Sequence, residues 1–213
     1  MTVDASATML WDIALFATVT TPEVLRLVQP NARLLAFLRD PTERLLSDYL
    51  HFFRKDRHDQ RVAEPSAHHF HSVCTAKVDA LNKCFRQQGV AACLLCSNYR
   101  NDYCRLELGI YSFFLQIWQS FFSEGQLLTL PLSKFSENPA KFLKAMFKHV
   151  GASPLTEHQI QKIVSLKHRN KNIDRVTMLP ETRRLLNGFY APFNQQLQHM
   201  QVYRRSLALL EQL

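Results

Sequence analysis

Arg39 and Ser47 are the two residues whose types and spacing most clearly suggest chemistry. Arg39 directly follows the apolar run 34–38, and Ser47 lies eight residues further along the chain. A guanidinium group and a hydroxyl group both donate hydrogen bonds to anions, and the N-terminus of a helix presents further N–H donors. The spacing predicts an anion site. It equally allows Arg39 to pair with a nearby carboxylate and Ser47 to be an ordinary surface residue.

The segment 33–53 contains the elements that would position these two residues. The apolar run 34–38 is too short for a helix and predicts a central strand buried on both faces. Pro41 suits the first position of a helix, and Asp40 before it can cap the open N–H groups. Apolar residues then recur with helical spacing at Leu45, Leu46, Tyr49, Leu50 and Phe53. Strand, tight turn and helix together form a unit that binds phosphate groups in open parallel sheets.

The rest of the chain predicts an α/β fold in one domain, residues 1–213. At 213 residues with 46% hydrophobic content, the chain is long enough for one sizeable core. A second short apolar run, 126–130, predicts another strand, and Asn138-Pro139 starts a helix that Gly151 closes. Further helices are expected at about 22–29, 103–122, 154–165 and 181–213, the last with a break at Pro192.

The formal net charge of +8 favours polyanionic partners. Nucleic acid, an anionic membrane surface and a sulfated polysaccharide would each satisfy this charge. Nucleic acid ranks last because the chain has no recognised nucleic-acid motif and no helix with a dense basic face. No apolar run approaches the length of a membrane span, and the first residues have no secretory signal pattern.

The segment LRDPTERLLSDY resembles the 3′-phosphate-binding segment of sulfotransferases that use 3′-phosphoadenosine 5′-phosphosulfate. DASATMLWD, GIYSFFLQIW, LSKFSENPAKFLKAMFKHVG and FYAPFNQQL extend the resemblance to the Golgi carbohydrate sulfotransferases over nearly the whole chain. The resemblance implies a P-loop-like sulfotransferase fold, with a parallel sheet flanked by helices. It also implies that Arg39 and Ser47 hold the 3′-phosphate of the nucleotide cosubstrate, with no metal.

The same resemblance implies a reaction and a compartment. The sulfuryl group would pass from the nucleotide to a hydroxyl of a galactosamine-containing glycosaminoglycan, such as chondroitin or dermatan sulfate, in the Golgi lumen. A general base would remove the hydroxyl proton during in-line displacement. The alternative is a truncated or degenerate relative that binds the nucleotide 3′-phosphate or a sulfated glycan without transferring anything.

The loop that cradles the 5′-phosphosulfate is the main departure from the family. In relatives this loop and its lysine precede the segment that DASATMLWD resembles, which puts the first strand and the loop before Met1. No Gly-rich Gly-Lys-[Ser/Thr] sequence occurs later. We therefore expect an N-terminally incomplete domain with no assignable catalytic residue, so the resemblance leaves open whether this chain is an enzyme. As written it should show no transfer, whereas a chain extended to include the loop should transfer.

Two further contacts are implied by position. Relatives carry a basic loop before their final helices that folds over the 3′ end of the nucleotide, and Arg169 and Lys171 occupy that position here. A solvated basic loop is the competing interpretation, because the spacing departs from the Lys-Gly-Arg form of many relatives. Asp4 and Ser6 match an element that lines the acceptor cleft, although ordinary turn or capping roles suit them equally.

The five cysteines lie between positions 74 and 104, and three histidines stand at 68, 69 and 71. Cys93-x-x-Cys96 does not have the paired spacing of a zinc ribbon, and histidines so close together indicate a metal only weakly. The resemblance implies a disulfide between Cys84 and Cys93, with Cys96 and Cys104 as a candidate second pair and Cys74 left over. In a reducing compartment all five would be thiols.

Overall fold

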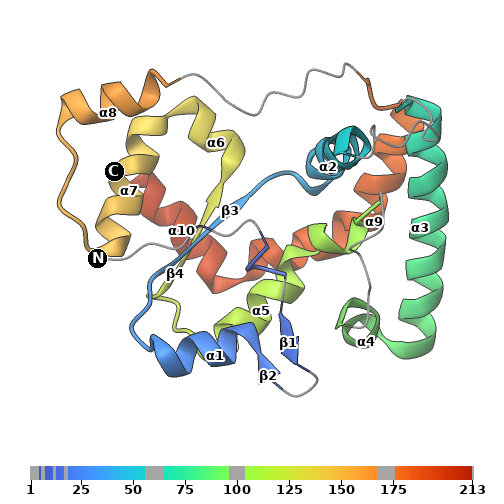
Figure 1. The fold of residues 1–213 in the computed structure, drawn as a ribbon, viewed down its shortest axis with the longest axis horizontal. Helices are drawn as coiled ribbons and strands as arrows, with labels where there is room; N and C mark the ends of the chain where they lie inside the picture. The colour runs from blue at the N-terminus through green and yellow to red at the C-terminus, as the bar shows by residue number, and fades with distance from the viewer. Residues whose placement is uncertain are drawn as a thin grey trace. The chain divides into compact units, whose positions relative to one another are not determined.

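The computed structural model describes residues 5, 8–11, 13–16, 19–55, 65–95, 104–166 and 176–212 (Figure 1). Contacts divide the chain into two compact units, unit 1 (Met1–Arg39, Tyr111–Lys167 and Gln195–Leu213) and unit 2 (Asp40–Ile110 and His168–Asn194). The elements are β1 (Ala14–Phe16), β2 (Val19–Thr20), α1 (Thr21–Val28), β3 (Leu34–Leu38), α2 (Pro41–Lys55), α3 (Ala67–Gln88), α4 (Val90–Leu95), the 3₁₀ helix η3 (Leu106–Gly109), α5 (Tyr111–Phe121), β4 (Leu127–Pro131), α6 (Leu132–Glu137), α7 (Pro139–Val150), α8 (Glu157–Val164), α9 (Pro180–His199) and α10 (Gln201–Glu211).

Unit 1 contains the parallel sheet that the two short apolar runs predict. β3 and β4 pair in parallel, with Leu34 opposite Leu127 and Leu38 opposite Pro131. Figure 1 shows the two strands side by side, and α10 packs on β4 and on α7. Parallel strands need a long connection, and the chain from α2 to α5 supplies it.

The predicted burial of β3 on both faces is wrong in part. Leu38 is buried, but the three residues from Leu34 are only half-buried and Phe37 is 44% exposed. Within the described part of the chain, β3 pairs with β4 alone, so one of its edges has no neighbouring strand. The continuous apolar run therefore marks the strand correctly but overstates its burial, whereas four of the five residues of β4 are buried.

The larger core of unit 1 lies under α5. Tyr111, Phe114, Leu115 and Trp118 form its buried face, and α5 contacts α1. The indole Nε1 of Trp118 donates to the carbonyl oxygen of Leu10 at 3.0 Å, which ties the start of the chain to this core. Residues of α10, including Val202, complete it.

His149 joins the two strands where they begin. It lies on α7, and its Nε2 is 3.1 Å from the carbonyl oxygen of Leu34 and 3.2 Å from that of Gln126. Both partners are acceptors, so Nε2 carries the proton and donates to them. Burial lowers the pKa of the imidazole below its usual 6.5, and this outweighs the two hydrogen bonds that favour the charged form. His149 is therefore a neutral clamp across the sheet.

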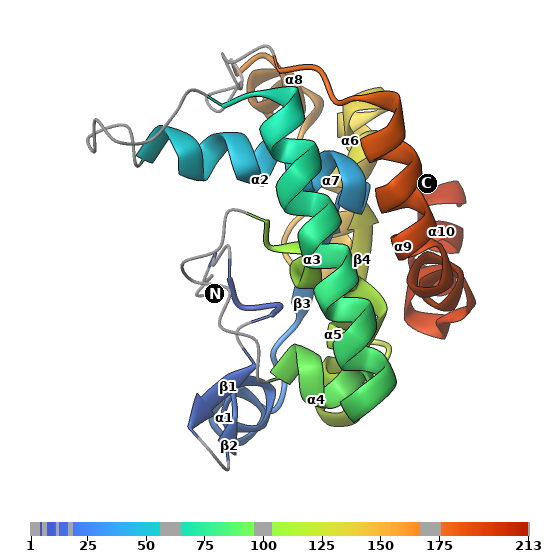
Figure 2. The same ribbon diagram turned by 90° about the vertical axis from the view of Figure 1, so that its right-hand side faces the viewer.

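Unit 2 is helical in its described part. Figure 2 shows α3 as its long helix, with α4 at the C-terminal end of α3. Phe70, Cys74, Val78 and Leu81 recur every three or four residues of α3 and are all buried. The predicted disulfide between Cys84 on α3 and Cys93 on α4 is confirmed. The candidate second pair falls partly outside the described residues, because Cys96 is not among them; the sulfur atom of Cys104 contacts that of Cys74.

The predicted helix over 103–122 begins later than its apolar period indicates. Residues 106–109 form the separate 3₁₀ helix η3, and α5 starts at Tyr111. The interruption coincides with a close packing contact at Gly109, where a Cβ atom would lie 2.7 Å from the hydroxyl oxygen of Tyr190 and 2.8 Å from the Cβ of Pro41. The hydroxyl of Tyr190 also donates to the carbonyl oxygen of Leu106 at 2.8 Å. Packing in unit 2 therefore overrides the helical period.

The helix break expected at Pro192 is also wrong. α9 continues through this residue to His199, and the chain turns at Met200 before α10. Proline at this position displaces the carbonyl group four residues earlier, which belongs to Gly188. Both Gly188 and Pro192 are exposed, so water can bind that carbonyl and the helix survives.

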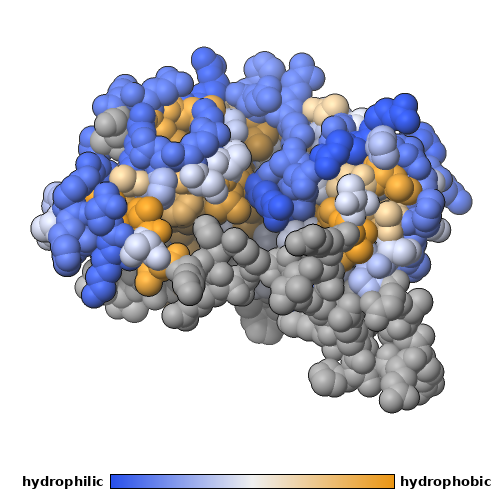
Figure 3. All heavy atoms as spheres, turned by 90° about the horizontal axis from the view of Figure 1, so that it is seen from above, coloured by the Kyte–Doolittle hydropathy of each residue, from blue (hydrophilic) through white to orange (hydrophobic). Residues whose placement is uncertain are grey.

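Helices α1, α2, α7 and α8 agree closely with the sequence, whereas α3 and α4 were not predicted. Asn138 caps α7 by accepting a hydrogen bond from the Lys141 N–H at 3.1 Å, and Gly151 ends the helix in the left-handed conformation with φ 69°. The short helix α6 was not predicted. Figure 3 shows the molecule from above relative to Figure 1. Hydrophilic residues cover most of the described surface in this view, and hydrophobic residues form smaller groups. None of the described helices is long and apolar enough to span a bilayer.

Candidate functional site

Arg39 lies in unit 1, one residue beyond β3. Leu38 before it is buried and anchors the end of the strand, whereas Arg39 itself is exposed. Its guanidinium group makes no ion pair or hydrogen bond with any residue in the described ranges. The carboxylate partner that the sequence left as an alternative is therefore not found among them. Such a guanidinium group keeps its donors available for an anion from solution.

The N-terminus of α2 lies in unit 2 and has the predicted cap. The Oδ1 of Asp40 accepts a hydrogen bond from the backbone N–H of Glu43 at 2.9 Å, and Pro41 begins the helix. Residues of α9 also bond the side chains of the first turn of α2. The hydroxyl of Thr42 donates to Asn187 Oδ1 at 2.9 Å, and Glu43 pairs with Arg183 at 2.6 Å. The start of α2 is thus fixed against α9.

Ser47 is half-buried in the second turn of α2, next to a charged network that fixes Asp48. The Nε of Arg105 donates to Asp48 Oδ2 at 2.8 Å, and its Nη2 pairs with Asp48 Oδ1. Arg44 reaches the same carboxylate at 3.2 Å and donates to the Arg105 carbonyl oxygen at 2.8 Å. Because all three side chains are largely buried, these bonds hold the middle of α2 in place.

Arg105 has a second contact in this network. Its guanidinium carbon lies 3.8 Å from the ring centroid of Phe52, so the planar cation stacks on the ring while its edge binds Asp48. Sequence reasoning missed Arg105. The pair of Arg44 and Asp48, four residues apart on one helix, had a local signal, but the partner 57 residues away had none.

The other predicted site residues lie outside the described residues. This applies to Arg169 and Lys171 of the basic loop and to Asp4 and Ser6 near the start. The chain after the basic loop is described from Val176. There Thr182 bonds His71 of α3 at 2.8 Å, close to the pair that Arg183 makes with Glu43 of α2.

Two of the three histidines indicated as weak metal candidates, His69 and His71, have other partners. The Nδ1 of His69 lies 2.8 Å from the hydroxyl of Tyr49, and His71 bonds Thr182. No group of three or more potential metal ligands occurs within the described ranges. Burial raises the pKa of the Tyr49 hydroxyl to about 12, so this phenol stays neutral at physiological pH and acts as a hydrogen-bonding core residue.

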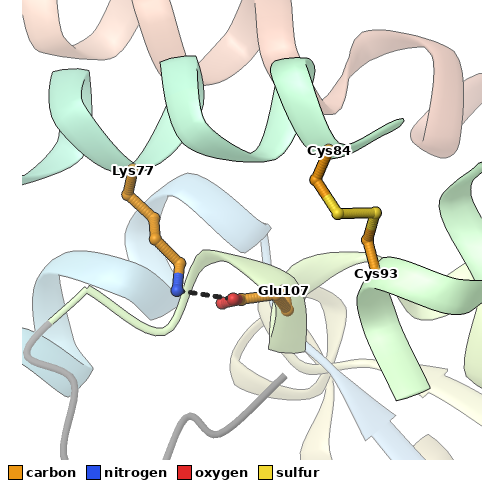
Figure 4. Close-up of a disulfide and its surroundings, with 4 residues drawn as sticks. All are labelled: Lys77, Cys84, Cys93 and Glu107. Carbon is orange, nitrogen blue, oxygen red and sulfur yellow. Dashed lines mark ion pairs between the residues drawn. A yellow bond between two sulfur atoms is a disulfide. The ribbon is translucent and has the colours of Figure 1, made fainter. Parts of the chain in front are cut away.

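A buried ion pair joins α3 to η3. Lys77 Nζ lies 2.6 Å from Glu107 Oε1, and the Glu107 side chain is only 1% exposed. Figure 4 shows Lys77 and Cys84 projecting from α3, with Glu107 and Cys93 reaching them from the segments alongside. The ion pair and the disulfide thus cross-link α3 at two points, two helical turns apart.

Over most of its length the chain is similar to curated carbohydrate sulfotransferases. Carbohydrate sulfotransferase 15 of Homo sapiens is 32% identical over 182 residues, which are 83% of this chain and 31% of the relative. The proteins of the same name from Rattus norvegicus and Mus musculus are each 31% identical over the same extent. The chain thus spans less than a third of the length of these curated relatives. No protein-family model matches the chain.

The fold has a solved counterpart. A sulfotransferase from Alicyclobacillus acidocaldarius superposes with a TM-score of 0.60 at 20% identity, over 97% of this chain and 66% of that one. At this identity the likeness concerns the fold. The parallel pair of strands with flanking helices is therefore the sulfotransferase fold, and the sequence resemblance to the carbohydrate sulfotransferases, among them the N-acetylgalactosamine 4-sulfate 6-O-sulfotransferase, is confirmed.

Proposed function

We propose that the protein carrying this chain is a carbohydrate sulfotransferase. It transfers the sulfuryl group of 3′-phosphoadenosine 5′-phosphosulfate to a hydroxyl of a galactosamine-containing glycosaminoglycan. The observation that carries the proposal is the 32% identity over 182 residues to carbohydrate sulfotransferase 15, and the common fold supports it. The reaction is an in-line displacement at sulfur, in which a general base takes the acceptor proton. The proposal assigns that base to no residue of this chain.

Arg39 and Ser47 are proposed to bind the 3′-phosphate of the nucleotide. Three observations support this role. Arg39 is exposed without an ion-pair partner among the described residues, Asp40 caps α2, and the network on Asp48 steadies the turn that carries Ser47. A 3′-phosphate carries strong acceptor oxygens, which a guanidinium group and a hydroxyl group can share.

Arg169 and Lys171 are proposed to contribute positive charge at the same end of the nucleotide. The support is indirect. Both residues precede α9 in the sequence, and the first turn of α9 is bonded to α2 through Arg183 and to α3 through Thr182. Two further cations would strengthen binding of a nucleotide bisphosphate mainly at low salt.

The acceptor and the compartment follow from the same family. A sulfated glycosaminoglycan suits the formal net charge of +8, because a polyanion is attracted over several ångströms. The disulfide between Cys84 and Cys93 suits the oxidising Golgi lumen, where such bonds persist. The reaction as proposed requires no metal.

Nucleotide titration tests the 3′-phosphate assignment. The probes are adenosine 3′,5′-bisphosphate and adenosine 5′-monophosphate, which differ only in the 3′-phosphate. We expect the wild type to prefer the bisphosphate. Arg39→Ala should weaken bisphosphate binding by about 1.5–3 kcal/mol, which corresponds to roughly 10- to 150-fold in Kd, because a charge-assisted contact is lost. Ser47→Ala should act in the same direction.

Matched controls separate this role from general charge. Arg204→Ala removes another exposed arginine, and Ser72→Ala another helical serine, and both should leave the preference for the bisphosphate intact. If Arg39→Ala has the same affinity as Arg204→Ala for each of the two nucleotides, Arg39 is not the 3′-phosphate ligand. The acceptor is tested separately by retention on immobilised chondroitin sulfate against heparan sulfate, with elution by a salt gradient.

A further inference from the structure

Cys74 and Cys104 form a pair of buried sulfur atoms that the proposed activity does not use. Their Sγ atoms lie 3.6 Å apart, and the two residues are 0% and 1% exposed. Cys74 lies on the buried face of α3, and Cys104 stands two residues before η3. Two sulfur atoms in van der Waals contact need to approach by only about 1.5 Å to reach the disulfide bond length of about 2.05 Å.

The surrounding bonds fix the register that brings the two sulfur atoms together. Lys77 follows Cys74 by three residues on α3, and Glu107 follows Cys104 by three residues, and these two side chains pair at 2.6 Å. Arg105, adjacent to Cys104, is tied to Asp48. The two chain segments are therefore held side by side at neighbouring points, independently of the cysteines.

A metal site is the competing use of two thiols, and the surroundings do not support it. A structural zinc ion needs four ligands, and no group of three potential ligands occurs among the described residues. We propose instead that Cys74 and Cys104 form a second disulfide when the protein folds in an oxidising compartment. The bond would join α3 to the chain entering η3, one turn before the ion pair and three turns before the bond of Cys84 to Cys93.

The step balances with an ordinary thiol oxidant, a disulfide of the dithiol–disulfide oxidoreductase or glutathione class. The thiolate of one cysteine attacks the oxidant's disulfide, forming a mixed disulfide and releasing one oxidant thiolate. The second cysteine, as its thiolate, then attacks the mixed disulfide and expels the other oxidant thiolate. Two electrons pass to the oxidant, whose two sulfur atoms take up two protons. Because both sulfur atoms are buried in the folded chain, we expect the oxidant to act before unit 2 closes.

Tryptic mapping without reduction tests the proposal, because the cleavage sites separate the cysteines. Cys74 falls on peptide 62–77, Cys84 on 84–86, Cys93 and Cys96 on 87–100, and Cys104 on 101–105. The chain is secreted through an oxidising compartment, denatured with N-ethylmaleimide present and digested. We expect 62–77 joined to 101–105, and 84–86 joined to 87–100. The same chain made in a reducing cytoplasm should yield alkylated 62–77 and 101–105.

Two outcomes overturn the proposal. The first is alkylated Cys74 and Cys104 in secreted protein whose Cys84 and Cys93 are joined. The second is a link between 87–100 and 101–105, which would mean that Cys104 pairs with Cys96. As a variant control, Cys96→Ala removes an uninvolved thiol and should leave both expected links in place. Because the wild-type map does not depend on a variant folding, the test stands even if Cys74→Ala fails to fold.

Discussion

The two units differ in what holds their elements together. Unit 1 relies on paired backbone and apolar packing: the parallel strands β3 and β4, and the cluster of Trp118, Phe114 and their neighbours. Unit 2 also has buried apolar residues, such as Tyr49 and Phe70, but it adds side-chain links between distant segments, namely a disulfide, the ion pair of Lys77 and Glu107, and the binding of Arg105 to Asp48. Unit 1 should therefore respond to changes in packing and pH, and unit 2 to loss of single charged or sulfur groups.

The largest effect is expected in unit 2 from Lys77→Met. This change removes the ammonium group that pairs with the buried carboxylate of Glu107 while keeping a side chain of similar length. Removing one partner of a buried ion pair typically costs about 3–5 kcal/mol, and the partial exposure of Lys77 favours the lower end. Hydrogen exchange should show the loss of protection first in α3 and η3, with the sheet of unit 1 less affected.

The double variant Lys77→Met/Glu107→Leu is the control for that experiment. Replacing both charges by apolar groups removes the buried carboxylate as well, so most of the stability should return. Urea denaturation measures both variants. If the double variant is as unstable as the single one, the cost lies in packing and not in the buried charge. If Lys77→Met reduces hydrogen-exchange protection equally in both units, the two units do not differ in what stabilises them.

A medium effect is expected from removing the covalent link of α3 to α4. Cys84→Ala/Cys93→Ala opens a loop with a sequence separation of 9. Chain entropy assigns roughly 2–3 kcal/mol to a loop of this size. The midpoint of urea unfolding should fall, and limited proteolysis should cut first around α4. Unchanged proteolysis at α4 would contradict the view that this disulfide holds the helix.

The smallest effect is expected in unit 1 on acidification. The pKa of His149 is lowered in the folded chain, so the unfolded chain takes up the proton first as the pH falls below about 6.5. The stability that the neutral His149 contributes is therefore fully present above this pH. It decreases as the pH falls toward the folded-state pKa. One such group changes the free energy of unfolding by at most about 1.4 kcal/mol per pH unit.

His149→Gln sharpens that measurement. The Gln amide nitrogen can donate to the carbonyl oxygens of Leu34 and Gln126, but it does not titrate. We expect stability at neutral pH to change little, and the pH dependence between 6.5 and 5 to become shallower. Hydrogen exchange of the backbone amides in β3 and β4 measures this pH dependence directly. If the free energy of unfolding of the wild type does not change over this pH range, His149 is not held buried and neutral in the folded chain.

The sequence predicted the elements of unit 1 better than the links of unit 2. Local signals define β3, β4 and α7, because an apolar run, an Asn-Pro start and a terminal Gly each act within a few residues, whereas β1 and β2 were not predicted. The errors arose where distant packing overrides a local pattern. The tight approach at Gly109 divides one predicted helix into two, and the exposed carbonyl side of Pro192 lets α9 continue.

The candidate site was predicted in the same uneven way. The cap by Asp40 follows from adjacent residues and is confirmed. Arg105, which fixes Asp48 beside Ser47, was missed because a bond across 57 residues leaves no periodic trace. The binding roles of Arg39 and Ser47 stay predictions, as do those of Arg169 and Lys171.

Gly109 has a consequence for how this protein can vary. The side chains of Tyr190 and Pro41 both lie within 3 Å of where its Cβ atom would be, so any added carbon atom collides with both rings. Gly188, by contrast, has nothing within 4 Å of a Cβ. In a library that replaces every residue in turn, position 109 should return glycine alone. Position 188 should accept alanine, with a gain of about 1 kcal/mol in helix preference.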